Sequence, residues 1–278
     1  MWLARLKARI GLPQRPVVPV VRLHGVIGRI GPRQAGMTLA DLAPALDRAF
    51  AWPGARAVAL TINSPGGSPA QSALIAGRIR DLAADGGLPV LAFVEDVAAS
   101  GGYWLALAGD EIRVSEASLV GSIGVIAAGF GFPEALRRLG VERRVHTAGE
   151  RKSLWDPFQP EKPEDVARLA AIQADLHRVF AAAVQSRRGE RLRGSPELLF
   201  SGEVWVGARA VELGLADGTG EVRAAMRARF GRKVRLPVVN PERRRWRVWP
   251  RVAADPAEWV SSTLAAVEER ATWTRYGL

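Results

Sequence analysis

The sequence predicts an α/β protein with a mostly parallel sheet. Segments typical of strands alternate with segments typical of helices, and turns rich in glycine or proline separate them. Parallel strands joined by helices have right-handed crossovers, and sites in such sheets form where the strands end. With 278 residues, 48% of them hydrophobic, the chain is long enough to bury a large core.

The first two strands are expected at residues 17–25 and 55–63, which are rich in valine and other apolar residues. Between them, residues 38–50 carry apolar residues at helical spacing, and Thr38 is a typical helix cap. A second helix is expected over residues 68–87, because its pattern stops at two consecutive glycines.

Further strands are expected at residues 88–94, 111–115, 118–127 and 141–149. The longest helix is expected over residues 163–189, with a proline in its first turn. The apolar residues along one face of this helix are expected to pack against the body of the protein or against a second subunit. They are Val166, Leu169, Ile172, Leu176, Val179 and Phe180.

Positive charge is concentrated at the two ends of the chain. Residues 1–15 hold four basic and no acidic residues, and residues 231–278 hold ten basic and five acidic residues, so the ends carry nine of the eleven net positive charges. This distribution and the lack of RNA-type motifs lead us to expect no nucleic-acid partner. We divide the chain into a basic amphipathic segment (1–16), one domain (17–230) and a basic tail (231–278).

The two ends also hold five of the nine tryptophans, namely Trp2, Trp246, Trp249, Trp259 and Trp273. Arginine beside tryptophan suits an anionic membrane surface, and solvated ends or ends packed on the body are the alternatives. No uncharged apolar run approaches the roughly 20 residues of a spanning helix, and a signal peptide is not recognisable. We therefore expect a protein in the cytoplasm or held peripherally at the cytoplasmic face of the inner membrane.

Two turns at the ends of predicted strands carry candidate chemistry. The chain has no cysteine, which excludes disulfides, thiolate catalysis and cysteine-bound zinc. Residues 63–67 (Asn-Ser-Pro-Gly-Gly) lack the Gly-Lys-Ser/Thr of a phosphate loop, so they are either a tight turn or a nest of N–H groups for an oxyanion. Ser100 lies where a strand is expected to meet a helix, so it is either a helix cap or a nucleophile.

A serine nucleophile needs a base. Among the three histidines, His24 closes the first strand and His177 occupies a surface-type position of the long helix, which leaves His146 as the histidine candidate. Lysine is the other route, and only four of the 39 basic residues are lysines. Lys152 precedes a leucine and a tryptophan that could desolvate its amine, so it is either this base or an exposed loop residue.

The chain contains five ordered motifs, INSPGGS, DVAASGGYW, VGSIGV, GERKSLWDPF and SGEVWVGARAVELGLAD. Their order and spacing, over roughly residues 17–225, resemble those of the signal peptide peptidase A (protease IV) family of Ser/Lys proteases. The resemblance implies a ClpP/crotonase-like fold of repeated ββα units with a mostly parallel sheet and oligomerising helices. It also implies a homo-oligomeric ring in which neighbouring subunits help to complete the active site.

On this resemblance, Ser100 matches the catalytic nucleophile and Lys152 matches the general base of a Ser/Lys dyad. The backbone N–H groups of Gly67 and Gly101 match the donors of the oxyanion hole. The implied function is a serine endopeptidase that uses no cofactor or metal and hydrolyses unfolded or hydrophobic peptides such as signal-peptide remnants. Two alternatives stay open, a crotonase-type acyl-CoA enzyme and a non-catalytic membrane-associated scaffold with the same fold.

Three further residues are expected to support the site. Ser122 either holds the catalytic lysine by a hydrogen bond or is an ordinary turn serine, while Asn63 and Asp96 are expected to fix the two turns.

The sequence departs from its relatives at Arg151, where they usually carry an aromatic residue, and in lacking their usual transmembrane segment or secretion signal. Its length matches one half of those family members that contain the domain twice. We therefore expect both dyad residues to come from one copy of the chain, and we expect a homo-oligomer.

Overall fold

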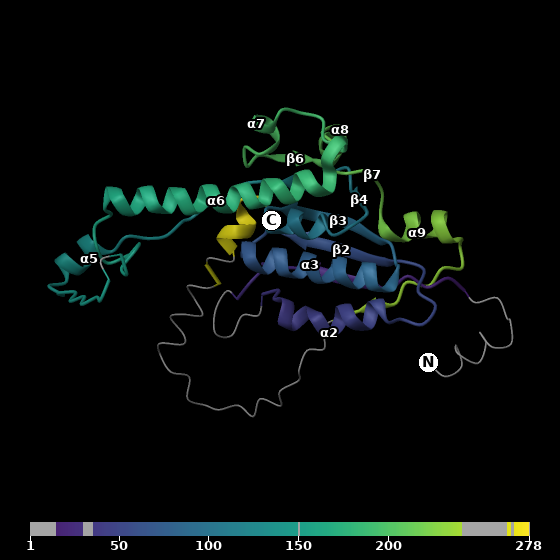
Figure 1. Cartoon of the computed structure of the whole chain (residues 1–278), viewed down its shortest axis with the longest axis horizontal. Coiled ribbons are helices and arrows are strands. Elements are labelled where there is room, and N and C mark those ends of the chain that lie inside the picture. Colours follow the sequence, from purple (N-terminus) through teal and green to yellow (C-terminus); the bar gives the residue numbers. More distant parts are fainter. Residues whose placement is uncertain (1–14, 30–35, 150, 241–265, 268–269, 278) are drawn as a thin grey trace, which may run out of the picture.

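The structure, a computed structural model, describes residues 15–29, 36–149, 151–240, 266–267 and 270–277. Its body is one sheet covered by helices, and a long helix extends from the body to a small projecting segment (Figure 1). We call this projecting segment, residues 130–149 and 151–160, the arm. The α/β architecture predicted from the sequence is confirmed.

In the described part of the chain, one mostly parallel sheet contains eight strands. They are β1 (Val20–His24), β2 (Val58–Ser64), β3 (Val90–Ala99), β4 (Glu111–Val114), β5 (Leu119–Gly121), β6 (Val204–Val206), β7 (Gly218–Thr219) and β8 (Val238–Val239). The order is β6-β5-β3-β2-β1-β8, with β4 between β3 and β7, and only the β5–β6 pair is antiparallel among the named strands. The ends of β2 and β3, which the turns at Gly67 and Ser100 follow, therefore lie at one end of the sheet.

The named helices are α2 (Leu39–Phe50), α3 (Pro69–Gly86), α4 (Gly101–Ala106), α5 (Pro133–Arg138), α6 (Pro163–Arg188), α7 (Pro196–Leu199), α8 (Gly207–Glu212) and α9 (Val222–Phe230), with a 3₁₀ turn η1 (Gly189–Arg191). Among the other described residues, 266–267 and 270–274 are also helical. The predicted caps are confirmed. Thr38 accepts a hydrogen bond from the N–H of Asp41, and Gly87 ends α3 with a left-handed φ of 59°. No described helix is both long enough and apolar enough to cross a membrane.

Strand β3 is longer than predicted, and it pairs with two different strands along its length. Its first half pairs with β4 through residues 91–94, and its last residues 97–99 pair with β5. This second pairing holds the end of β3 in extended form up to Ala99. The next residue, Ser100, is thereby held at the exit of a strand that has neighbours on both sides.

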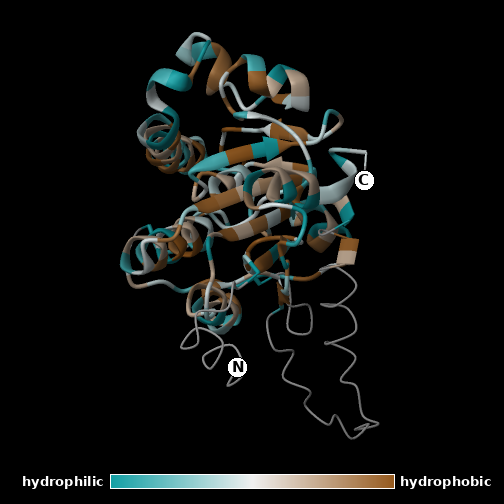
Figure 2. Ribbon diagram, turned by 90° about the vertical axis from the view of Figure 1, so that its right-hand side faces the viewer, coloured by the Kyte–Doolittle hydropathy of each residue, from teal (hydrophilic) through white to brown (hydrophobic). Residues whose placement is uncertain are grey.

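Apolar side chains cover both faces of the sheet. Leu60 and Ile62 of β2 join α2, α3 and α4 in the larger core, whereas Phe93 of β3 packs with Met226 of α9 on the opposite face. The alternation along each strand produces the two faces. Figure 2 shows the strands in mostly hydrophobic colours at the centre of the molecule.

Three expectations about elements need correction. Residues 141–149 form no strand and are exposed in the arm. Arg143 interrupts the alternation between Val141 and Val145, so the segment has no continuous apolar face to bury. The strand expected at 118–127 ends at Gly121, since Ser122 takes a φ of 51°. Residues 231–240, expected to begin the tail, supply β8, which pairs with β1.

Candidate active site

Ser100 occupies a sharp turn between β3 and α4. Its backbone has φ 53° and ψ −122°, a conformation that costs a residue with a side chain about 1–3 kcal/mol. The turn is held by three hydrogen bonds: the N–H of Ser100 donates to Gly121 O (2.8 Å), and its carbonyl accepts from Tyr103 (3.0 Å) and Trp104 (3.1 Å). The hydroxyl makes no capping hydrogen bond, so helix capping does not explain this serine.

The glycine turn that follows β2 touches Ser100. A methyl group added to Gly66 would lie 2.8 Å from Cβ of Ser100, and one added to Gly101 would lie 3.4 Å from the backbone nitrogen of Gly67. Within the described part of the chain, the N–H groups of Gly67 and Gly101 donate no hydrogen bond. Two free donors beside a serine hydroxyl are the arrangement that stabilises an oxyanion.

Close packing explains why both donors belong to glycine. A methyl group on Gly67, whose φ is 140°, would lie 2.1 Å from the carbonyl oxygen of Ile27. One on Gly101 would lie 2.4 Å from Oγ of Ser72. Side chains at either position would therefore push the two loops apart.

Ser100 and Gly67 line a cavity of about 880 Å³. One wall is formed by residues from two segments, within 122–128 and 200–204, and another consists of Gln173, Ala174 and His177 on α6. Its apolar lining includes Val125, Ile126, Ala128, Phe200 and Val204. The cavity is large enough for several residues of an extended peptide.

The three expected support residues lie in two places. Ser122 lines the cavity, its N–H donates to Glu203 O (2.6 Å), and its hydroxyl lies 3.5 Å from the hydroxyl of Tyr276. Asn63 and Asp96 lie outside the cavity lining, and Nδ2 of Asn63 donates to Oδ2 of Asp96 (2.5 Å). This bond ties the end of β2 to β3.

The structure does not bring Lys152 to Ser100 within one chain. Lys152 is exposed in the arm, where its N–H donates to Gly149 O (3.2 Å), and it is not among the residues that line the cavity. The residues that follow it, such as Trp155, border a small hollow with Val166 and Leu169 near the start of α6. In Figure 1 this start of α6 lies at the arm, far along the helix from the body.

His146 differs from its predicted position at a strand end, whereas His24 closes the first strand as predicted. His146 is exposed in the arm, away from Ser100. His24 ends β1, where Nε2 lies 3.3 Å from Oε2 of Glu95 and 3.2 Å from Oγ1 of Thr61. Burial lowers the pKa of His24, although the Glu95 carboxylate opposes this shift.

His177, which the sequence places at a surface-type position, lines the cavity instead. Its Nε2 is shielded from solvent and has no hydrogen-bond partner in the described part of the chain. A signal was available, because His177 lies three residues before Phe180 of the apolar stripe and so shares its helix face.

Residues near the C-terminus also reach this cavity. Thr272, Arg275 and Tyr276 are among its lining residues. Figure 1 shows the C-terminal end beside α6 and α3. Side chains from the last part of the chain therefore border the same space as the candidate nucleophile.

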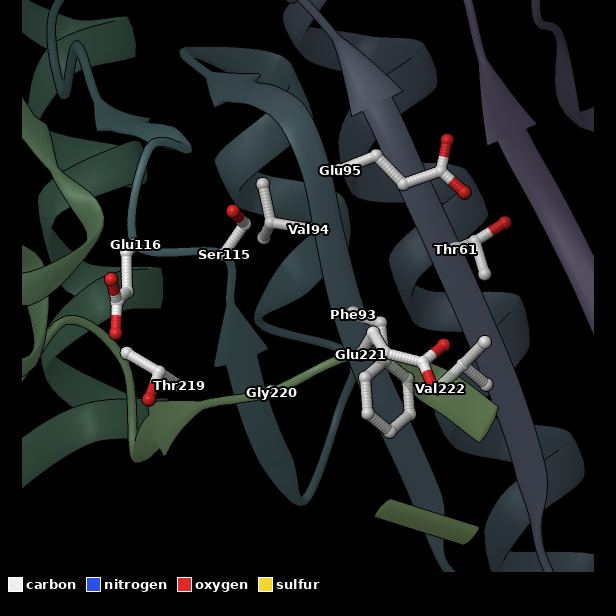
Figure 3. Close-up of a pocket in the computed structure, with 10 residues that line it drawn as sticks. All are labelled: Thr61, Phe93, Val94, Glu95, Ser115, Glu116, Thr219, Gly220, Glu221 and Val222. Atoms are coloured by element: carbon white, nitrogen blue, oxygen red, sulfur yellow. The ribbon is translucent and has the colours of Figure 1, made fainter. Parts of the chain in front are cut away.

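A second cavity, of about 420 Å³, lies on the face of the sheet that α9 covers (Figure 3). It contains Glu95, Glu116 and Glu221, but Figure 3 shows these carboxylates spread apart, and that of Glu221 caps α9 by accepting from Arg223 and Ala224. None of the expected catalytic residues lines this cavity. Among the described residues, no cluster of His, Cys, Asp and Glu could hold a metal ion.

Comparison with protein families gives one match, to a model described as Peptidase family S49, over residues 83–233. The match begins near the end of α3 and includes the Ser100 turn, the arm and α6. It therefore contains most of the elements that surround the cavity.

Individual relatives cover the chain to different extents. The chain is 49% identical over 272 residues to a Na(+)/H(+) antiporter NhaA of Brucella abortus, a match to 94% of this chain but only 37% of that protein. It is 33% identical over 175 residues to the chloroplastic serine protease SPPA of Arabidopsis thaliana (62% of this chain, 25% of that protein). Protease 4 of Haemophilus influenzae is 29% identical over 173 residues (62% and 27%).

The chain thus spans little more than a third of the antiporter and about a quarter of the two proteases. Because so little of the antiporter is covered, its name assigns no activity to this chain. Among solved structures, a mutant of the 1510-N membrane-bound stomatin-specific protease in complex with a substrate peptide has a TM-score of 0.51 at 15% identity, covering 91% of this chain and all of that one. This likeness confirms the fold.

Proposed function

The chain belongs to peptidase family S49, and on this premise we propose that it is a serine peptidase whose nucleophile is Ser100. One observation carries the proposal: a strained serine at a strand-to-helix turn lies beside two N–H groups, of Gly67 and Gly101, that donate to nothing else in the described chain. Each such donor contributes about 3 kcal/mol to stabilising the transition state in well-studied hydrolases.

In the proposed reaction, Oγ of Ser100 attacks the carbonyl carbon of a peptide bond while Lys152, as the free amine, takes the hydroxyl proton. The carbonyl oxygen becomes an oxyanion that the N–H groups of Gly67 and Gly101 bind. The C–N bond then breaks, and the ammonium of Lys152 returns the proton to the leaving amine. Water, deprotonated by the same amine, hydrolyses the ester on Ser100 and restores the enzyme.

The sequence led us to expect both dyad residues from one copy of the chain, but Lys152 is instead proposed to serve Ser100 of a neighbouring chain in a homo-oligomeric ring. The exposed position of Lys152 and its absence from the cavity lining of its own chain support this assignment. The arm and the outer part of α6 also carry apolar side chains that the described chain leaves exposed and that a second copy would cover. They include Phe130, Leu139, Val166, Ile172 and Val179.

The proposed substrates are unfolded or hydrophobic peptides, such as the remnants of signal peptides. The apolar cavity wall formed by Val125, Ile126 and Phe200 supports this class. Peripheral contact with an anionic membrane surface at the cytoplasmic face is proposed for the basic ends of the chain. Residues 1–14 and 241–265, which hold most of that charge, lie outside the described residues.

Hydrolysis of fluorogenic casein by the purified chain tests this function, with Ser100→Ala, Lys152→Ala and His146→Ala measured in parallel. We expect the first two variants to lose activity and the third to keep it. Loss in His146→Ala but not in Lys152→Ala would replace the Ser/Lys dyad with a Ser/His pair. An inactive wild type would favour the scaffold, and binding of an acyl-CoA thioester would favour a crotonase-type enzyme that uses the same N–H pair for an enolate.

A further inference from the structure

Helix α6 is fixed to the body of the protein close to the Ser100 turn. Phe180 of α6 is 3% exposed and stacks on Trp104 of α4, with ring centroids 4.7 Å apart and planes 6° apart. About two turns further along, Arg187 donates hydrogen bonds to the carbonyl oxygens of Leu107 (2.8 Å) and Gly109 (3.0 Å). These contacts set which face of α6 borders the cavity.

That face brings His177 to the cavity. Residues three or four apart in a helix share a face, so His177 lies on the side of Phe180 that points to the body, together with Gln173 and Ala174. All three line the cavity that contains Ser100 and Gly67. The imidazole is therefore fixed to the same rigid unit as the nucleophile, since Trp104 and Ser100 both belong to the α4 turn.

The imidazole has an unused hydrogen-bonding atom. Nε2 of His177 is shielded from solvent and has no partner in the described chain, whereas polar atoms buried in proteins usually have one. A shielded nitrogen without a partner is unfavourable in the free protein. A ligand that supplies the missing partner would recover this loss on binding.

A peptide backbone offers the matching groups, because it presents both N–H donors and C=O acceptors along an extended chain. A neutral imidazole nitrogen pairs with one or the other according to its tautomer. Ser201 and Gln173 also line the cavity, but only His177 combines a cavity position with an unpartnered, shielded side-chain nitrogen in the described chain.

We infer that His177 is a substrate-binding residue, whose Nε2 forms a hydrogen bond to the backbone of a peptide bound in the Ser100 cavity. The inference rests on the proposed peptidase function. Thr272, Arg275 and Tyr276 line the same cavity, so a peptide bound there competes with these side chains for space. His177 acts on the binding of the peptide and takes no proton from Ser100.

Direct binding separates this inference from the function on which it rests. The probe is a fluorescein-labelled heptapeptide of alternating alanine and leucine, and its affinity for the full chain with Ser100→Ala is measured by fluorescence anisotropy. In that background His177→Phe is expected to weaken binding about fivefold to tenfold, the value of one hydrogen bond. His177→Gln, which keeps a donor and an acceptor, is expected to bind within about twofold of the parent.

The matched control is Arg178→Gln, since Arg178 lies next on the helix, pairs with Asp175 and is 75% exposed. It is expected to leave affinity unchanged. With Ser100 intact, His177→Phe is expected to raise KM while kcat stays within about twofold. Its melting temperature should not fall, because Nε2 has no bond to lose in the free chain.

Three results would overturn the inference. They are an affinity of His177→Phe within twofold of the parent, equal weakening by Phe and Gln, and no saturable binding by the parent. If binding depends on His177 but the chain with intact Ser100 hydrolyses nothing, the peptidase function fails and the inference stands. If hydrolysis is found but His177→Phe leaves KM unchanged, the inference fails and the function stands.

Discussion

Mixing two inactive variants tests whether Lys152 of one chain serves Ser100 of another. Ser100→Ala removes the nucleophile and Lys152→Ala removes the base, so each variant alone should lose about 1000-fold or more of the activity. Lys152 lies outside the cavity of its own Ser100, so a productive pair is expected only between neighbours. With random assembly of equal amounts into a ring, about one contact in four joins an intact serine to an intact lysine, so about a quarter of wild-type activity should return.

The assay is casein hydrolysis by the two co-expressed variants, each carrying a different affinity tag that shows whether mixed assemblies form. A second mixture, of wild type with the chain carrying both substitutions, distinguishes the arrangements further. Pairing between chains again leaves about a quarter of the sites active, whereas pairing within a chain leaves about half. Mixed assemblies with no more activity than the single variants, or a chain that stays monomeric and active, would refute the reasoning.

Three further predictions concern the frame around the site. Phe180→Ala should lower the free energy of unfolding by about 3–5 kcal/mol, because the ring is buried against Trp104; a loss under about 1 kcal/mol in urea unfolding would contradict this packing role. Gly66→Ala should abolish hydrolysis, since its methyl group would lie 2.8 Å from Cβ of Ser100. The control Gly77→Ala, whose methyl group would have nothing within 4 Å, should stabilise α3 by about 0.5–1 kcal/mol. An active Gly66→Ala enzyme would contradict the close contact between this turn and Ser100. Burial raises the pKa of Asp217, but the hydrogen bonds from Arg188 and from the N–H of Ile112 outweigh it and hold that pKa below its usual value. The stability that this carboxylate contributes is present above its unfolded pKa of about 3.9 and is lost as the pH falls through the lower folded value. Asp217→Asn should therefore flatten the dependence of the free energy of unfolding on pH in the acid range. An unchanged slope would exclude the Arg188–Asp217 pair as the cause of that dependence.

Elements with local signals were predictable. The caps at Thr38 and Gly87 act within one turn of their helices, and the proline and apolar spacing of α6 also belong to that helix alone. Strands β6 and β7 contain three and two residues, too few for a periodic pattern. They exist because the sheet edge provides partners for them, which one segment of sequence does not reveal.

In the candidate site too, some positions could be predicted from the sequence and others could not. The motifs around Ser100 and Gly67 lie at strand ends, and the parallel sheet brings such ends together, so their meeting was predictable. The position of His177 depends on the stacking of Phe180 on Trp104, a contact between distant parts of the chain. The separation of Lys152 from Ser100 depends on the direction of the arm, which no local pattern encodes.

The C-terminal side chains in the cavity also affect how the kinetics should be interpreted. Thr272, Arg275 and Tyr276 belong to the same chain as Ser100, so dilution of the protein does not dilute them relative to the cavity. A tethered group of this kind competes at an effective concentration on the order of millimolar. We therefore expect the KM of this chain to reflect competition with these side chains as well as the affinity for the peptide, and a chain that lacks residues 270–278 to give a different constant for the same chemistry.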